Sequence, residues 1–343
     1  MARKSDSSSR SPTGAALMPT NLQGVFSFAP KDKSIDLRKA DLKTLLRHGV
    51  PPRPKGRESA SAARLWDKIM ARPLRHIHPH LTVLNAVKPP PGMRSKRKPA
   101  RSKRGDSQNS DMSSSVWSGG VVTPAGHRLV TVYANWVIPS VLRPAGAPDS
   151  DSPWKSVAWV GLDGEGSADV LQAGTTQMVE VADDWDNDDP DNITYYAWYE
   201  WFPDSEVRID NFPVAAGDAM FVYVRFEGQD ATGVNYGSAW LVNLTTGIET
   251  SVYFPEPGAT ATFTTGFLGN SAECIMEQPS FTDNMGNQVQ FNFVHYGEVA
   301  FVNFGACADD QTLFTAADLT TLGLMGGLSD GEHSAAIVCQ PPG

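Results

Sequence analysis

Residues 194–202 read TYYAWYEWF, a run of aromatic side chains that contains one carboxylate. In an extended strand successive side chains point to opposite faces, so Trp198 and Glu200 share one face while Tyr199 and Trp201 share the other. The second face is typical of an apolar core. The first interleaves an acid with aromatic rings, and this pattern predicts a strand whose outer face lines a cleft.

Strand-like segments of similar character recur on both sides of this run, separated by turns rich in Gly, Asp, Asn and Pro. They lie at 128–138, 156–162, 219–227, 238–243, 250–254, 260–266, 272–277, 288–294 and 299–304. No long helical pattern interrupts them. The sequence therefore predicts an all-β fold over residues 112–343, a two-sheet antiparallel β-sandwich of the jelly-roll or concanavalin type.

Charge divides the chain into two parts. Up to residue 110 there are 24 Lys and Arg against 7 Asp and Glu, whereas the remainder has 5 against 31. Residues 1–111 are thus predicted to form a basic, partly helical N-terminal arm, with helices at 34–48 and 60–70 and a Lys/Arg-rich linker at 88–111. Repulsion among the carboxylates of the 112–343 domain fades as they are protonated, which favours an acidic working environment.

Several classes of protein lack support. No apolar run is long enough for a membrane-spanning helix, and the first 20 residues show no apolar stretch typical of a signal peptide. GxSxG, HExxH, CxxC and P-loop patterns are absent, and three cysteines cannot build a disulfide framework, although Cys307 and Cys339 remain free to pair. The acidic run at 183–192 lacks the glycine and final Glu of a calcium loop. We expect neither a metal nor a cofactor.

Two further strands add to the candidate cleft. In VAWVGLD, Trp159 and Asp163 fall on the same face, and in AECIMEQ, Glu273 and Glu277 do so. At this point two interpretations stay open. The acids and rings line a concave site, or the acids face solvent beside a tryptophan core.

Five motifs in order carry a family resemblance. They are AWVGLDG (158–164), VLQAG (170–174), YAWYEWFPD (196–204), NLTTG (243–247) and AECIMEQ (272–278), with Trp117-Ser-Gly-Gly and Val137-Ile-Pro139 upstream. Together the set resembles the glutamic peptidases, or eqolisins, over residues 112–305. The fold of that family, two bent antiparallel sheets, agrees with the strand pattern.

The resemblance implies an acid endopeptidase that uses a Gln/Glu pair without a metal, a cofactor or a covalent intermediate. By motif the catalytic pair is Gln172 and Glu277. A carboxylate with an ordinary pKa of about 4.3 is a general base and acid for water, and a neutral amide stabilises the oxyanion. The resemblance also implies that Trp159, Asp163, Trp198 and Glu200 bind substrate or support the pair.

The same resemblance sets expectations about partners. Protein or peptide substrates, an extracellular or other acidic compartment and a monomer without nucleic-acid or membrane partners are implied. We interpret the arm as an inhibitory prosegment of a zymogen, attracted to the acidic body near neutral pH so that a helical segment crosses the cleft, and loosened by acid. Two features differ from the fungal enzymes: Tyr196 stands where they usually have an acid, and their cysteine pairs are missing.

Three alternatives remain. Exposed aromatic rings on a concave sheet also stack on sugars, as in a carbohydrate-binding sandwich without catalysis. The basic arm alone is compatible with a nucleic-acid or anionic-membrane tail. A glycosidase would need two carboxylates roughly 5–10 Å apart, which Glu200 and Glu277 would have to supply.

Overall fold

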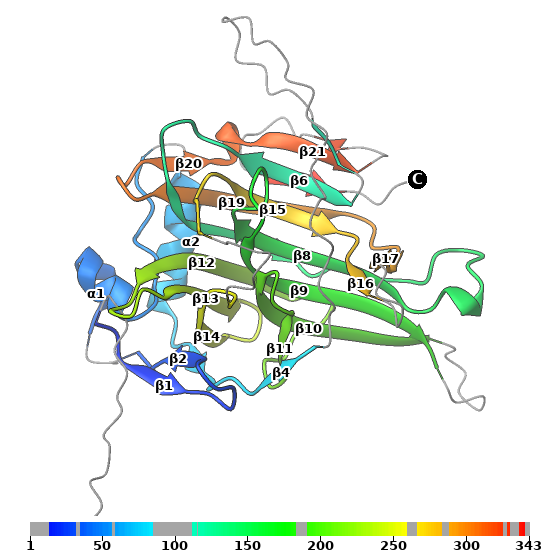
Figure 1. Ribbon diagram of the computed structural model, residues 1–343, viewed down its shortest axis with the longest axis horizontal. Helices are drawn as coiled ribbons and strands as arrows, with labels where there is room; N and C mark the ends of the chain where they lie inside the picture. The colour runs from blue at the N-terminus through cyan, green and yellow to red at the C-terminus, as the bar shows by residue number, and fades with distance from the viewer. Residues whose placement is uncertain are drawn as a thin grey trace, which may run out of the picture.

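The protein folds into two large, mainly antiparallel β-sheets packed face to face (Figure 1). The computed structural model describes residues 14–31, 35–56, 59–84, 112–114, 116–182, 191–258, 266–282, 288–324, 328–329 and 336–339. Within these residues one sheet has 11 strands and the other has 10. The β-sandwich predicted from the sequence is thereby confirmed.

The 11-stranded sheet has the order β1 (Leu17–Pro19), β2 (Phe26–Phe28), β14 (Ile248–Pro255), β13 (Asn235–Asn243), β12 (Ala219–Gln229), β7 (Leu129–Val137), β19 (Val299–Ala308), β23 (Ala336–Cys339) and β22 (Leu328–Ser329). In addition, β20 (Leu313–Thr315) pairs with β19, and β3 (Arg75–His76) pairs with β14.

The 10-stranded sheet has the order β4 (Leu81–Val83), β11 (Val207–Ile209), β10 (Asp191–Phe202), β9 (Val170–Val181), β8 (Trp154–Leu162), β15 (Ala272–Glu277), β6 (Trp117–Val122), β21 (Thr320–Leu324) and β5 (Met112–Ser114), with β18 (Asn292–Phe293) beside β8. A two-stranded sheet joins β16 (Ser280–Thr282) to β17 (Gln288–Gln290). The helices are η1 (Leu37–Lys39), α1 (Leu42–Arg47), α2 (Ala60–Ala71), η2 (Asp149–Asp151) and η3 (Ala316–Asp318).

The main core lies between the two sheets and takes one face of β10. Tyr199 packs against Phe254 with ring centroids 4.4 Å apart, and Trp201 meets the same ring edge to face. Trp198 belongs instead to a separate apolar cluster with Trp159. The two faces predicted for the aromatic run therefore exist, one in the core and one outside it.

The N-terminal arm packs on the outer face of the 11-stranded sheet. Leu45, Trp66 and Ile69 of the arm join one buried cluster with Phe221 and Trp240 of the body. Lys31 also forms a largely buried ion pair with Glu249, and the Trp240 indole N–H donates to the same carboxylate at 2.8 Å. Both helices of the arm thus lie over this sheet (Figure 1), whereas the sequence led us to expect a helical segment across the cleft.

One strand of the arm reaches the other sheet. β4 pairs antiparallel with β11, with Thr82 opposite Arg208, at the edge of the 10-stranded sheet (Figure 1). The Leu84 N–H continues this pairing by donating to the Glu206 carbonyl at 2.9 Å, and its side chain packs against the outer apolar cluster. Leu84, the last described residue of the arm, therefore lies beside the outer face of this sheet.

Predicted helices differ in how well they agree with the structure. The helix expected at 60–70 is α2. The one expected at 34–48 is divided, because Ala40 is extended and the Asp41 side chain accepts from the Thr44 N–H to start α1 afresh. The linker at 88–111, most of the strand expected at 260–266 and most of the acidic run at 183–192 lie outside the described residues.

Candidate active site

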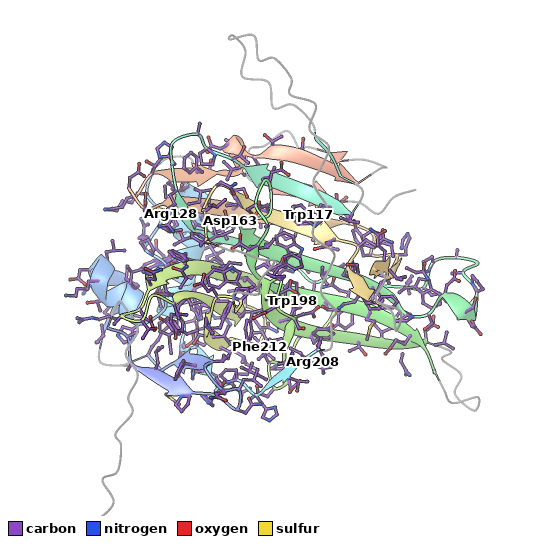
Figure 2. The ribbon with its side chains drawn as sticks, in the orientation of Figure 1. Trp117, Arg128, Asp163, Trp198, Arg208 and Phe212 are labelled. Atoms are coloured by element: carbon purple, nitrogen blue, oxygen red, sulfur yellow. The ribbon has the colours of Figure 1, made fainter. Side chains whose placement is uncertain are left out.

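The outer face of the 10-stranded sheet gathers the candidate residues from four adjacent strands. Strand register places Trp198 of β10 opposite Gly174 of β9, and Gly174 opposite Trp159 of β8. Glu200 lies opposite Gln172 in the same way, and Glu277 projects from the end of β15. Trp198, labelled near the centre of the sheet in Figure 2, and Trp159 are almost fully buried in the outer cluster.

Two glycines make room for the Trp159 ring. A Cβ at Gly161 would lie 2.9 Å from that ring and 3.2 Å from the Gln172 Cβ, and one at Gly174 would lie 2.7 Å from the Trp159 Cβ. Larger residues would push the indole off the sheet. The glycines of AWVGLDG and VLQAG therefore let Trp159 lie flat, next to Gln172.

Trp159 positions the carboxyl of Glu277. Its indole N–H donates to Glu277 Oε2 at 2.8 Å. The Trp117 ring meets the Trp159 ring edge to face at 5.2 Å, which fixes the indole from its other side. Held in this way, the carboxyl has an orientation set before any substrate arrives.

Gln172 and Glu200 form a second pair on the same face. The amide nitrogen of Gln172 donates to Glu200 Oε2 in a short hydrogen bond, while its buried amide oxygen has no hydrogen-bond partner among the described residues. A protonated Glu200 donates an O–H, which an amide oxygen accepts. Rotation of the amide by half a turn would then pair the two groups and leave the amide N–H₂ to face a substrate.

Both carboxyls hold their protons more strongly than exposed glutamates. Burial raises the pKa of Glu277 to about 7, although hydrogen bonds from Trp159 and Trp117 lower it. Burial, with repulsion from Glu206 and Glu277, raises the pKa of Glu200 to about 8. From the sequence we assumed an ordinary glutamate pKa, because burial beside the tryptophan rings is a tertiary effect.

Sequence reasoning missed an ion pair on this face. Lys155 Nζ lies 3.2 Å from Glu206 Oε2, and both side chains are largely buried. The ammonium sits over the Tyr196 ring at 5.6 Å, and the Arg208 guanidinium lies over the same ring at 4.9 Å. Figure 2 shows Arg208 below Trp198, its partner across β10 and β11. Lys155 and Glu206 are 51 residues apart, so no local pattern signals them.

Asp163 lies apart from this group. β8 ends at Leu162, and Asp163 takes a φ of 66°, so the alternation of the strand does not extend to it. It is fully buried, and its carboxylate accepts from the Leu268 and Asn270 backbone N–H groups at 2.8 Å each. Figure 2 shows it near Arg128. Its observed contacts support the 266–271 loop and leave it without a surface for substrate.

Among the described residues, no three or more His, Cys, Asp and Glu side chains are grouped so that they would hold a metal ion. Cys274, Cys307 and Cys339 are free thiols, so the pairing left open for the last two is not formed. No helix in the described part of the chain has the length and apolarity needed to span a membrane.

Comparison with known proteins adds an independent result. The model of the peptidase A4 family matches residues 115–327, which include every candidate residue and exclude the described part of the arm. Scytalidopepsin B of Scytalidium lignicola is 28% identical over 224 residues, 65% of this chain and 70% of that protein. Aspergillopepsin-2 of Aspergillus niger is 29% identical over 220 residues, 58% of this chain and 67% of that protein. A crystal structure of scytalido-glutamic peptidase with a transition state analog inhibitor aligns with a TM-score of 0.49 at 24% identity, covering 66% of this chain and 98% of that one.

Proposed function

The chain belongs to the peptidase A4 family, and we propose that it is an acid endopeptidase in which Glu277 transfers the protons and the Gln172 amide stabilises the oxyanion. One observation carries this proposal. The Trp159 indole holds the Glu277 carboxyl and lies against the Gly161 position, next to Gln172, on one largely buried face. A carboxyl and an amide are thereby available to the same peptide bond.

The protonation state of Glu277 sets its first role. With a pKa of about 7, the carboxyl is protonated in all but about one molecule in a thousand at pH 4. It therefore begins as an acid, and donates its proton to the carbonyl oxygen of the scissile peptide as a water molecule attacks the carbon. The resulting carboxylate then takes a proton from the attached water, which leaves a neutral tetrahedral diol and a protonated Glu277.

The second half of the reaction uses the same proton. Glu277 donates it to the peptide nitrogen, the C–N bond breaks with its electrons on the nitrogen, and the amine departs. One hydroxyl of the diol returns a proton to the carboxylate, giving the free acid product and the starting enzyme. No covalent intermediate forms, and water is the only compound consumed besides the peptide.

Gln172 and Glu200 act on the same carbonyl oxygen, which carries negative charge while the attack of water runs ahead of proton transfer from Glu277. At acidic pH Glu200 is protonated, since its pKa is about 8, and its O–H is a donor for the Gln172 amide oxygen. That arrangement aims the amide N–H groups at the carbonyl oxygen of the substrate. A preformed donor of this kind typically contributes about 10²–10³ in rate.

Trp159 and Trp198 are buried while Leu84 of the arm packs against their cluster, and they would supply apolar surface for the substrate once the arm has left. The buried indole N–H of Trp198 has no partner in the described residues, so it is a candidate donor to the peptide backbone. Asp163 would act at a distance, by holding the 266–271 loop. We expect the enzyme to act as a monomer on proteins in an acidic compartment.

The test is a pair of substitutions in the full chain, assayed on acid-denatured protein at pH 4. Glu277→Gln is nearly isosteric and should abolish turnover, and Gln172→Ala should lower kcat by about 10²–10³. Glu273→Gln is the matched control, because Glu273 lies on the same strand and face and is fully buried. Near-normal kcat/KM in a folded Glu277 or Gln172 variant would refute the assignment.

For the arm we propose the role of an inhibitory prosegment. Its strand β4 adds to the edge of the candidate sheet, and Leu84 packs against the cluster that contains Trp159 and Trp198. The opposite charges of arm and body favour this contact near neutral pH, and the attraction weakens as carboxylates protonate. A cut within residues 94–111 would relieve inhibition while helices α1 and α2 stay packed on the 11-stranded sheet.

Acid incubation of the full chain tests the prosegment. Mass spectrometry should detect cleavage within 94–111, with activity appearing in step with it. In the Glu277→Gln variant the same chain should stay whole, which separates self-cleavage from a contaminating protease. Full activity of the uncut chain at pH 5.5 would overturn the inhibitory role.

A further inference from the structure

The ion pair of Lys155 and Glu206 is unusual in its position. The domain from residue 112 onwards has only five Lys and Arg side chains. One of them, Lys155, is placed on the candidate face, with 8% of its side chain exposed, against 13% for Glu206. A buried ion pair costs desolvation that its attraction often fails to recover, so its presence needs an explanation other than stability.

The surroundings hold this pair firmly. The ammonium of Lys155 lies 5.6 Å from the centre of the Tyr196 ring and 5.3 Å from the centre of the Phe291 ring. The second oxygen of Glu206 accepts from the Thr176 hydroxyl at 3.5 Å. Burial opposes the charge of Lys155, but attraction to Glu206 and contact with Tyr196 outweigh it and raise the pKa of the ammonium. The positive charge is therefore permanent at any working pH.

The charged and titratable groups around the pair come from several strands. They are Glu277 on β15, Glu200 and Tyr196 on β10, and Arg208 on β11. Strand register puts Glu277 opposite Val157, which is two residues from Lys155 along β8, so Lys155 and Glu277 share one face of adjacent strands. The two glutamates feel both members of the pair, with opposite signs. Lys155 favours their ionised forms, whereas Glu206 favours their protonated forms.

We propose that Lys155 and Glu206 are positioning residues, a fixed pair of charges that sets the protonation of the Glu277 and Glu200 carboxyls. The proposal rests on the catalytic roles given above. Neither residue touches the reacting atoms. Each acts through the field it adds at the carboxyls, and the two contributions partly cancel, so removal of one member leaves the other uncompensated.

Opposite shifts follow for the two single variants. If protonated Glu277 starts the reaction, kcat/KM falls at high pH as that proton is lost. Lys155→Met removes the charge that favours ionisation, and this fall should move up by about one pH unit. Glu206→Gln leaves the ammonium unopposed, and the fall should move down by a similar amount. The double variant, which removes both charges, should return close to the parent.

The experiment measures kcat/KM from pH 3 to 9 for these three variants and the parent in the full chain. Arg225→Met is the matched control, because Arg225 lies 3.2 Å from Glu227 in another buried ion pair, on the 11-stranded sheet. It should leave the pH profile in place. A pair that merely supported the fold would lower stability in all variants without moving the profile in two directions.

Carboxyl ¹³C NMR of glutamate-labelled protein gives a readout independent of turnover. The Glu277 resonance, assigned by its loss in Glu277→Gln, should titrate higher in Lys155→Met and lower in Glu206→Gln. Unmoved titrations, or shifts of one sign in both variants, would overturn the positioning role. Retained activity in Glu277→Gln would instead refute the catalytic assignment, and the titrations would still decide the influence of the pair.

Discussion

Glu200 should make the fold less stable as the pH rises from acid to neutral. In the unfolded chain its carboxyl titrates near 4.5, whereas in the fold its pKa is about 8. Between these values the unfolded state releases a proton that the folded state keeps, so the free energy of unfolding falls as pH rises. The contribution is fully present below pH 4.5 and is lost by about pH 8.

The rise in the pKa of Glu200 from 4.5 to about 8 corresponds to a change of at most about 5 kcal/mol in the free energy of unfolding. Repulsion from Glu206 and Glu277 supplies part of it, and the Glu200 residue is only half-buried. We therefore expect Glu200→Gln to unfold like its parent at pH 4 and to be about 2–4 kcal/mol more stable at pH 8. Such a difference is a large share of the 5–15 kcal/mol typical of a domain.

Urea unfolding followed by tryptophan fluorescence measures this difference, with Glu277→Gln as the parent so that self-cleavage does not interfere. That parent lacks the repulsion from Glu277, so we expect a difference of about 2 kcal/mol in it, the lower end of the range. Glu298→Gln is the control, because Glu298 is an exposed acid of the same domain, so that variant separates the effect of losing one carboxylate from the effect of its buried position. If the free energy of unfolding changes equally with pH in the Glu200 variant and its parent from pH 4 to 8, the Glu200 carboxyl is not held protonated in the fold.

Further predictions concern catalysis and the arm. Because the pKa of Glu277 is about 7, kcat/KM should fall about tenfold per pH unit above that value, and a flat profile from pH 3 to 8 would contradict this. Trp198→Ala should raise KM several-fold more than it lowers kcat in steady-state assays; an unchanged KM would remove Trp198 from the substrate surface. Gly174→Val should cost at least about 2 kcal/mol in urea unfolding, since its Cβ would lie 2.1 Å from the Ala158 carbonyl oxygen, and parent-like stability would show that the strand adapts. Leu84→Asp should shorten the lag before activity appears on acidification, and an unchanged lag would show that Leu84 does not contribute to inhibition.

Local patterns in the sequence predicted the parts of the fold that depend on single strands. Alternation in TYYAWYEWF separates Trp198 from Trp201 in the structure, and the strands around it appear as β7, β8, β12 and β19. The sequence pattern does not predict β9 as a strand, because GTTQ in its middle has no apolar alternation. The short strands of the arm were also missed, since they gain stability only by pairing with the body.

The residues of the candidate site could be predicted where residue type and strand face are enough. They could not be predicted where contacts between distant segments decide. Gln172, Glu200 and Glu277 came from motifs, and the structure brings them to one face. Asp163 was assigned to that face by alternation, but the strand ends one residue earlier. The Lys155–Glu206 pair and the raised pKa values depend on distant segments and on burial, which no local pattern encodes.

Because the arm contributes strands to both sheets, expressing the protein without the arm or in two pieces should have different results. A polypeptide that begins at Met112 would leave Phe221 and Trp240, now under α2, facing water, and would lack the edge strand beside β11. We expect such a product to aggregate in the host. Residues 1–84 and 112–343, encoded as two separate polypeptides and expressed together, should instead assemble as a split protein near neutral pH, because strands and helices of the first contact the second directly.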